Sequence, residues 1–293
     1  MSLTGLAPAK INLFLHVGPL QADGYHPVAS LVAFADVGDR VTVEAADRLS
    51  LTVEGPFGAG LAAEPDNLIL KALRALGQAT GIGEPALHVT LDKQLPIAAG
   101  LGGGSADAGT ALKLARELLS LDLDDAALEA VAGVVGADGP MCLRARSAWA
   151  EGRGDVLTDA AYLPPLHAVL VNPGVPSPTG AVYRAFDAGP AGATDRPAPP
   201  ADWRAATVIG WLAQQRNDLE PPALALTPAI RPALDAVAAQ PGVGLTRMSG
   251  SGATVFGLFA EPEDADRAAV ALAAAHPGWW VRPTVLGATA AGL

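Results

Sequence analysis

Between residues 96 and 108 the chain reads PIAAGLGGGSADA. This stretch follows an alternating, strand-like run over 87–92 and leads directly into a helical pattern that extends to about Ser120. Glycines let the backbone approach a phosphate and direct several N–H groups toward it, and the free N–H groups at a helix start favour the same anion. The stretch therefore predicts a phosphate-binding unit of strand, loop and helix.

Two familiar phosphate-binding loops do not fit this spacing. A Walker loop requires G-x-x-x-x-G-K-[ST], but no lysine follows these glycines, and Gly100 to Gly104 do not match the dinucleotide fingerprint G-x-G-x-x-G. A flexible helix start is the plain structural alternative. Five glycines fall within residues 100–109, however, and such a density would cost order without a compensating function, so we favour phosphate binding.

The 293-residue chain is acidic, with 19 Lys and Arg against 30 Asp and Glu and a formal net charge of −11. This balance argues against electrostatic capture of nucleic acid or of an anionic membrane, so any phosphate must be held locally. Cys142 is the single cysteine and the first residues show no export signal, which predicts a cytoplasmic protein. Prolines interrupt the longest uncharged stretch, 160–183, so we expect no transmembrane segment.

Strand-like alternation and helix-like spacing are mixed along the whole chain, which is typical of an α+β protein. A Pro-rich turn at 163–165 predicts a boundary between two domains, residues 1–163 and 164–293, and the Pro- and Gly-rich segment 188–201 predicts a loop inside the second. We expect strands over 8–17, 41–44, 49–54, 87–92 and 167–171, and helices over 68–76, 111–119, 203–212, 230–237 and 263–275.

The first strand, 8–17, carries polar side chains on one face. Alternation places the aliphatic residues 11, 13, 15 and 17 in the core and places Lys10, Asn12, Phe14 and His16 on the opposite face. That face is either an ordinary solvent-exposed strand surface or part of a site. Lysine is scarce here, with only four in the chain, and this scarcity favours a functional role for Lys10.

A turn at Asp23-Gly24 is followed by Tyr25 and His26. A planar base could stack on Tyr25 while His26 bonds its edge, as proteins do with unpaired nucleobases. From these residues alone, a simply packed turn is the alternative.

The glycine stretch resembles the ATP-binding signature of the GHMP kinases, a superfamily of small-molecule kinases. The segments 7–13, 22–26, 136–140 and 248–257 narrow the resemblance to the branch that acts on 4-diphosphocytidyl-2-C-methyl-D-erythritol in the non-mevalonate isoprenoid pathway. The resemblance covers nearly the whole chain. It implies a two-domain α+β GHMP kinase fold, with an N-terminal domain similar to ribosomal protein S5 domain 2, a C-terminal α+β domain and an active site in the cleft between them.

The resemblance also implies roles for individual residues. Asp138 would be the catalytic base and Lys10 its partner, although Asp138 in its Gly- and Pro-flanked corner could also be a plain turn or capping residue. Asn67 would lie near the adenine, although Asp66 and Asn67 also read as a helix cap. The remaining ATP-binding residues would be Pro96, Ala99, Gly100, Leu101, Gly102, Gly103, Gly104, Ser105 and Ala106.

The substrate side of the site follows in the same way. Tyr25 and His26 would hold the cytosine, with Tyr183 as the second aromatic ring and Phe186 as the alternative to it, and Asn12 would bind the diphosphate or erythritol end. The turn at 249–252 would close over the reacting phosphates, or would be a tight strand start. Mg²⁺ is implied together with ATP, but its ligands are not evident, since Ser105 and Asp107 are the only obvious oxygens near the loop.

The resulting hypothesis is an ATP-dependent kinase that phosphorylates the 2-hydroxyl of the cytidine diphosphate-linked methylerythritol. The expected partner is thus this small molecule, with no nucleic acid and no membrane, and the sequence specifies no oligomeric state. A homoserine- or mevalonate-type kinase is the rival within the superfamily, and the Tyr25-His26 pair argues against it. A nucleotide sensor without catalysis is the rival from another class, and the presence of both Lys10 and Asp138 argues against that.

Overall fold

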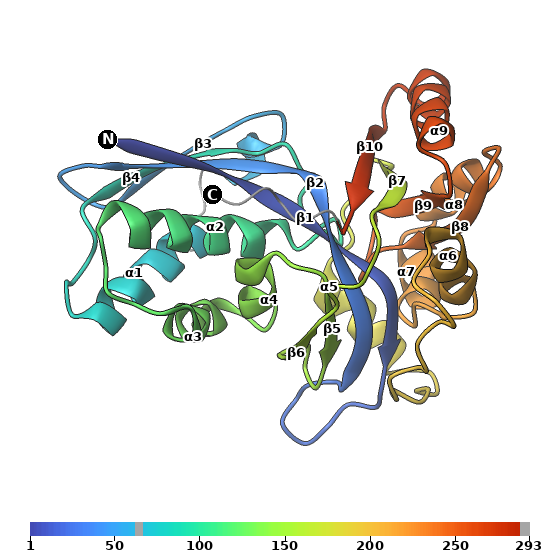
Figure 1. Ribbon diagram of the computed structural model, residues 1–293, viewed down its shortest axis with the longest axis horizontal. Coiled ribbons are helices and arrows are strands. Elements are labelled where there is room, and N and C mark those ends of the chain that lie inside the picture. Colours follow the sequence, from blue (N-terminus) through green and yellow to red (C-terminus); the bar gives the residue numbers. More distant parts are fainter. Residues whose placement is uncertain (62–66, 288–293) are drawn as a thin grey trace.

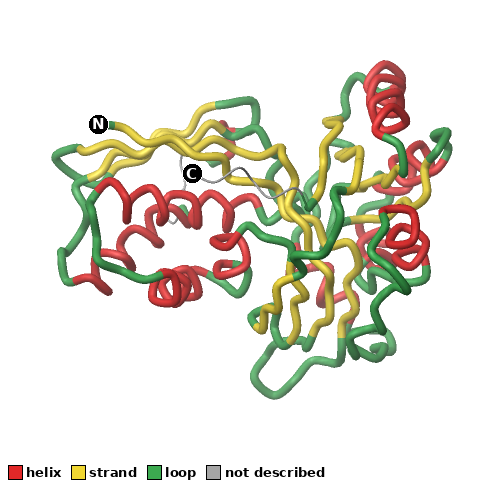
Figure 2. The backbone as a smooth tube through the Cα atoms, viewed as in Figure 1, coloured by secondary structure: helices red, strands yellow, loops and turns green. Residues whose placement is uncertain are grey.

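The computed structural model describes residues 1–61 and 67–287, so Asp66 lies outside the described residues. Strands and helices form two parts, each with helices packed on a sheet, and the hairpin of β1 and β2 runs from one part into the other (Figures 1 and 2). The α+β class predicted from the sequence is confirmed, and all ten predicted strands and helices are present.

The strands belong to two sheets that meet at one point. The first sheet contains β1 (Ser2–Val17), β2 (Val28–Ala45), β3 (Ser50–Glu54), β4 (Leu87–Asp92), β5 (Ala148–Glu151) and β6 (Val156–Asp159). The second contains, in spatial order, β10 (Trp280–Leu286), β7 (Leu166–Asn172), β9 (Val255–Phe259) and β8 (Val243–Met248).

The helices of the first part lie on one face of the first sheet (Figure 1). They are α1 (Leu68–Thr80), α2 (Gly103–Leu118), α3 (Asp125–Val135) and α4 (Gly139–Arg144), and a single 3₁₀ turn, Gly58–Gly60, precedes them. In the second part, α8 and α9 pack on one face of the sheet and α6 on the other. The helices there are α5 (Thr179–Phe186), α6 (Ala205–Ala213), α7 (Glu220–Leu226), α8 (Ile230–Ala238) and α9 (Pro262–Ala275).

From Ala7 to Val17, strand β1 is buried on both faces, which corrects the simple alternation expected for it. Lys10, Asn12, Phe14 and His16 are at most 8% exposed, so the solvent-exposed strand surface is ruled out. The register with β2 shifts between Pro8 and Lys10 and again between Asn12 and Phe14. Such irregularities re-aim side chains and occur beside functional sites. Lys10 is therefore set within the interior of the protein.

The two sheets join where β10 reaches β2. Leu286 pairs with Ala35, and the N–H of Gly287 donates to the Phe34 carbonyl at 3.0 Å. The Asp36 carboxylate accepts hydrogen bonds from β10, including one from the N–H of Val285 at 3.1 Å. A continuous core of β1, β7, β9 and α6 residues lies beside this joint, so the two parts share buried surface near the site.

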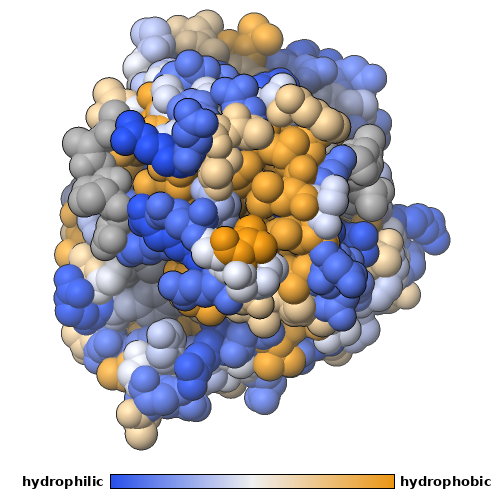
Figure 3. Space-filling model, turned by 90° about the vertical axis from the view of Figure 1, so that its left-hand side faces the viewer, coloured by the Kyte–Doolittle hydropathy of each residue, from blue (hydrophilic) through white to orange (hydrophobic). Residues whose placement is uncertain are grey.

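In residues 1–61 and 67–287, no helix has the length and apolar character needed to cross a membrane. At the end of the molecule that carries the tips of β1 and β4, apolar side chains gather in one area and hydrophilic side chains surround it (Figure 3). The predicted loop 188–201 contains no helix or strand, and it is held to α6 by a hydrogen bond from the Trp211 indole to the Ala198 carbonyl at 2.9 Å.

Candidate active site

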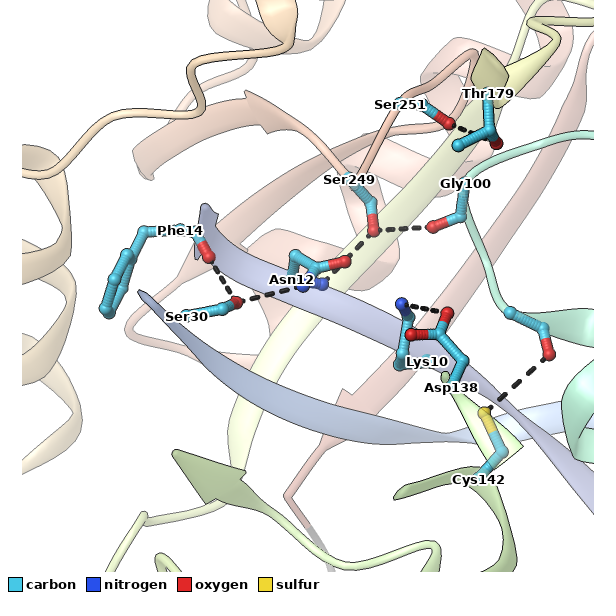
Figure 4. A network of polar contacts seen from close by, with 11 residues as sticks. Lys10, Asn12, Phe14, Ser30, Gly100, Asp138, Cys142, Thr179, Ser249 and Ser251 are labelled. Atoms are coloured by element: carbon cyan, nitrogen blue, oxygen red, sulfur yellow. Dashed lines mark hydrogen bonds and ion pairs between the residues drawn. The ribbon is translucent and has the colours of Figure 1, made fainter. Parts of the chain in front are cut away.

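The geometry brings Lys10 and Asp138 together from positions 128 residues apart. Lys10 Nζ lies 2.8 Å from Asp138 Oδ2, and the Lys10 side chain is 9% exposed whereas that of Asp138 is 41% exposed (Figure 4). Asp138 occupies the position before the first residue of α4, but its side chain caps no backbone N–H of that helix. The plain capping role is therefore wrong for Asp138, because its carboxylate is directed to Lys10 instead.

The charge state of Lys10 depends on this pairing. Burial is the largest influence and acts to lower the pKa of the Lys10 ammonium. The negative charge of Asp138 and its hydrogen bond act in the opposite direction and prevail, so the pKa of Lys10 lies above its ordinary value. Lys10 therefore carries a positive charge that points toward a partly open carboxylate.

The glycine loop lies against Lys10. The N–H of Lys10 donates to the Leu101 carbonyl at 2.8 Å, which fixes the strand to the loop. Gly102 has a φ of +63°, and a Cβ added there would lie 3.1 Å from Lys10 Cβ. Glycine is thus required at this position by its backbone conformation and by the close approach of Lys10.

Carbonyl groups of the loop are turned toward the second part of the molecule. The Ala98 carbonyl accepts from the N–H of Ser177 at 3.0 Å, and the Ala99 carbonyl accepts from the N–H of Thr254 at 3.1 Å. The Gly100 carbonyl accepts from Ser249 Oγ at 2.9 Å (Figure 4). Because carbonyl and N–H groups of a trans peptide point in opposite directions, these bonds direct the following N–H groups away from the second part.

Helix α2 begins at this loop without a side-chain cap. Gly102 precedes it and offers no capping oxygen, and its first turn contains no acidic residue. The first N–H groups of a helix have no intrahelical partner and carry partial positive charge. These N–H groups meet no capping side chain at the start of α2, and phosphate binding there stays a prediction.

The turn at 249–252 packs against this loop. Ser249 Oγ accepts from the N–H of Asn12 at 3.2 Å while it donates to Gly100, so one hydroxyl links β1, the glycine loop and the turn (Figure 4). Asn12 is 5% exposed, and its Nδ2 donates to Ser30 Oγ at 2.9 Å. Substrate contact by Asn12 stays a prediction.

Sequence reasoning missed Asn217, which holds the same turn. Its Nδ2 donates to the Met248 carbonyl at 2.9 Å and to the Gly250 carbonyl at 2.8 Å, and its Oδ1 accepts from the N–H of Leu219. Asn217 lies 31 residues from Met248, and no local pattern marks it. Only the fold reveals its role.

The residues predicted for the cytosine pocket lie close together. The His26 ring is 5.0 Å from that of Tyr183 and 5.7 Å from that of Phe186, so both aromatic alternatives flank it. His26 Nδ1 donates to the Gly18 carbonyl at 2.8 Å, and its Nε2 lies 3.3 Å from Asp187 Oδ1. Tyr25 is 49% exposed and lines the same cavity as His26.

Arg153 also lines this cavity and was not predicted. Its guanidinium lies 4.6 Å from the centre of the Tyr25 ring and makes an ion pair with Asp23 at 2.6 Å. The residue belongs to the turn between β5 and β6, a segment without any motif. The exposed ring that would receive a base is therefore covered by a cation on one side.

The charges of Lys10 and Asp138 both act on Tyr183. Burial raises the pKa of the Tyr183 hydroxyl, and the charges of both Lys10 and Asp138 reach it, the first lowering and the second raising that pKa. The Tyr183 ring thus lies beside the His26 ring and is influenced by the charges of both Lys10 and Asp138.

Two further predicted positions have structural partners. Asn67 is the N-cap of α1, and its Oδ1 accepts from the N–H of Ile69 at 2.9 Å, so its capping role is observed and its contact with adenine stays a prediction. Asp107 is 2% exposed and its Oδ2 accepts from Lys93 Nζ at 2.7 Å. It is therefore buried beneath the loop and is not an open metal ligand.

Comparison with known proteins agrees with this geometry. Two protein-family models match, the GHMP kinases N terminal domain over residues 67–145 and the GHMP kinases C terminal domain over 206–278. A 4-diphosphocytidyl-2-C-methyl-D-erythritol kinase of Caulobacter vibrioides is 53% identical over 285 residues, which cover 96% of this chain and 98% of the relative. The relative of the same name from Dinoroseobacter shibae is 50% identical, with 97% of this chain and 95% of the relative covered.

Solved structures show the same relationship. A crystal structure of 4-(cytidine 5′-diphospho)-2C-methyl-D-erythritol kinase superposes with a TM-score of 0.80 at 35% identity, over 98% of this chain and 100% of that one. A homoserine kinase from Cytophaga hutchinsonii has a TM-score of 0.72 at 18% identity, covers 98% of this chain and 95% of its own, and shows the fold alone. The chain belongs to the GHMP kinases and, within them, to the 4-diphosphocytidyl-2-C-methyl-D-erythritol kinase family.

Proposed function

We infer that this protein transfers the γ-phosphoryl group of ATP to the 2-hydroxyl of 4-diphosphocytidyl-2-C-methyl-D-erythritol, a step in non-mevalonate isoprenoid precursor biosynthesis. Membership of the kinase family supports the reaction and the use of ATP. The observation that carries the proposal is the Lys10–Asp138 ion pair at 2.8 Å, which lies beside the glycine loop and acts electrostatically on Tyr183, the ring next to His26.

The proposed mechanism uses this pair directly. Asp138 accepts the proton of the substrate 2-hydroxyl while the oxygen of that hydroxyl forms a bond to the γ-phosphorus. The bond from the γ-phosphorus to the β,γ-bridging oxygen breaks at the same time, and ADP leaves. Lys10 holds the carboxylate in place and offsets negative charge on the moving phosphoryl group. The partly exposed carboxylate and the buried ammonium support this division of roles.

The nucleotide would be held by main-chain groups. We propose that residues 96 and 99–106 contact ATP, because the orientation of the loop carbonyls leaves N–H groups and the uncapped start of α2 for the phosphates. Local binding of this kind suits a protein with a net charge of −11. Asn67 at the start of α1 would lie beside the adenine.

Mg²⁺ is expected to accompany ATP, and the described residues fit an ion held mainly by the nucleotide. Over 1–61 and 67–287, no group of three or more His, Cys, Asp or Glu side chains is placed to share a metal ion. Mg²⁺ in kinases commonly keeps water ligands and binds substrate phosphates with few protein groups. When bound there, it would neutralise charge on the phosphates.

Three finer assignments belong to the same proposal. The substrate cytosine would stack between Tyr25 and Tyr183, with His26 bonding its edge, and Asn12 would face the diphosphate or erythritol end. The boundary between the domains would fall after Leu163, in the Pro-rich turn before β7. A cytoplasmic location is proposed because the single cysteine, Cys142, cannot form an internal disulfide.

A coupled ADP-release assay tests the proposed function. Purified protein with ATP and Mg²⁺ is expected to release ADP when 4-diphosphocytidyl-2-C-methyl-D-erythritol is added. Turnover of homoserine or mevalonate without turnover of this substrate would favour the rival kinases. Binding of ATP and substrate by calorimetry without ADP release would instead identify a sensor.

A further inference from the structure

A lysine is buried directly beneath the start of α2. Lys93 is 3% exposed, and its Nζ lies 2.5 Å from Asp39 Oδ2 and 2.7 Å from Asp107 Oδ2. A Cβ added to Gly103, the first residue of α2, would lie 3.0 Å from this ammonium. Lys10 and Lys93 thus lie close to two successive glycines, Gly102 and Gly103, although only Lys10 takes part in the proposed reaction.

The two carboxylates bound by Lys93 are linked to opposite ends of the glycine loop. Asp39, from β2, also accepts from the N–H groups of Gln94 at 2.7 Å and Leu95 at 2.8 Å, which lead into the loop. Asp107 lies on the first turns of α2, where the chain leaves the loop. The single ammonium of Lys93 therefore joins the incoming and the outgoing ends of the segment 96–102.

Stability alone does not account for this arrangement. Buried ion pairs commonly contribute less than well-packed apolar side chains of the same size, because both charges lose their hydration. Here one cation is shared by two carboxylates, and Asp107 Oδ1 has no hydrogen-bond partner. Burial is the main cause that raises the pKa of Asp107, while the charge of Lys93 acts in the opposite direction, so the ionised carboxylate depends on this lysine.

We propose that Lys93 is a positioning residue for ATP, which ties the two ends of the glycine loop together through Asp39 and Asp107 and so holds the loop ready for the phosphates. The inference rests on the proposed function only for the identity of the nucleotide. A loop fixed before binding loses less conformational freedom when the ligand arrives. Loss of the tie should therefore weaken ATP binding and leave the cytidine pocket unaffected.

Two substitutions of Asp107 distinguish the role of its hydrogen bond with Lys93 from the role of its negative charge. Asp107→Asn and Asp107→Leu both remove the carboxyl and leave Lys93 paired with Asp39, but only asparagine keeps an oxygen that can accept from Lys93. The readout is the dissociation constant of ATP, measured by calorimetry on the whole chain, beside that of the cytidyl substrate. We expect Asp107→Leu to weaken ATP binding by about tenfold, and Asp107→Asn and the substrate constant to stay within about twofold of wild type.

A control outside the loop accounts for general destabilisation. Arg144 of α4 and Glu129 of α3 form an ion pair with two hydrogen bonds, at 2.7 and 2.8 Å. Within the described part of the chain, neither side chain is hydrogen-bonded to the glycine loop. The double variant Arg144→Met/Glu129→Gln should lower the melting temperature without changing ATP affinity. If it weakens ATP binding as much as Asp107→Leu does, the positioning role is wrong.

The remaining outcomes also decide the question. Wild-type ATP affinity in folded Asp107→Leu protein refutes the proposal, as does an equal loss in Asp107→Asn. If Asp107→Leu does not fold, the triple variant Asp39→Asn/Lys93→Met/Asp107→Leu decides, because it leaves no buried charge without a partner and the amide oxygen at position 39 can still accept from the N–H groups of Gln94 and Leu95. It too should lose ATP affinity. Because ATP binding is measured directly, failure of the proposed kinase reaction would leave this test intact.

Discussion

Replacing Asp138 with asparagine tests the proposed base without removing its shape. The amide oxygen of the variant can still accept from Lys10, as Asp138 Oδ2 does at 2.8 Å, but the amide cannot take the proton of the substrate hydroxyl. A positioned general base typically contributes about 10²- to 10⁴-fold in rate, which corresponds to about 3 to 5 kcal/mol. We therefore expect Asp138→Asn to lower kcat by a factor in this range.

Binding should be affected much less than turnover. The Asp138 side chain is 41% exposed and the amide oxygen of the variant can still accept from the buried Lys10, so the dissociation constants of ATP and substrate should change by less than about threefold. Coupled ADP release gives kcat, and calorimetric titration gives both constants. A rate near that of wild type would remove Asp138 from the mechanism, and a loss confined to binding would make it a substrate-holding residue.

The pH dependence of the same variant provides a second readout. In the wild type the Asp138 charge keeps the pKa of Lys10 above its ordinary value against the effect of burial. Without that charge, burial acts to lower the Lys10 pKa, so the ammonium loses its proton at a lower pH. The residual activity of Asp138→Asn should therefore decline on the alkaline side at a lower pH than wild-type activity does. If the activities of wild type and variant declined at the same alkaline pH, the effect of Asp138 on the pKa of Lys10 would be contradicted.

Three further predictions concern other parts of the site. Tyr25→Ala should weaken substrate binding by about 5- to 150-fold, the equivalent of about 1–3 kcal/mol of stacking, with ATP affinity unchanged; equal losses in calorimetric titrations would place Tyr25 elsewhere. Gly102→Ala combines a positive φ with a 3.1 Å approach to Lys10 and should weaken ATP binding by about tenfold, whereas Gly81→Ala, with a φ of +75° and open space, should lower only the melting temperature. Arg247→Met deprives the carbonyls of Leu13, Leu212 and Gln215 of their donor and should reduce the free energy of unfolding by about 3 kcal/mol in urea titration; an unchanged midpoint would show that these carbonyls find other donors.

The glycine stretch could be interpreted from sequence because its information is local. Spacing and composition predicted a strand, a loop and a following helix, whose start the structure places at Gly103, and the resemblance to a family placed Lys10 and Asp138 in one site. The residues alone also allowed a capping role for Asp138 and an exposed surface for Lys10. Their ion pair joins positions that no periodic pattern relates.

The features that sequence reasoning missed depend on distant partners. The two register shifts in β1 are invisible to simple alternation, which assumes an uninterrupted strand. Lys93 is 54 residues from Asp39, and Asn217 is 31 residues from Met248, so neither pair follows from a motif. Arg153 stands in a short turn whose position over Tyr25 is set by the pairing of β5 with β2.

The bonds that join the glycine loop to Ser177, Ser249 and Thr254 have a consequence for the order of folding. A nascent chain that ends before these residues already contains the whole loop and α2, but the carbonyls of residues 98–100 still lack their partners. Contacts over such sequence separations are slow to form, because a long segment must first be closed. Competence to bind nucleotide should consequently arise late, after most of the polypeptide has left the ribosome.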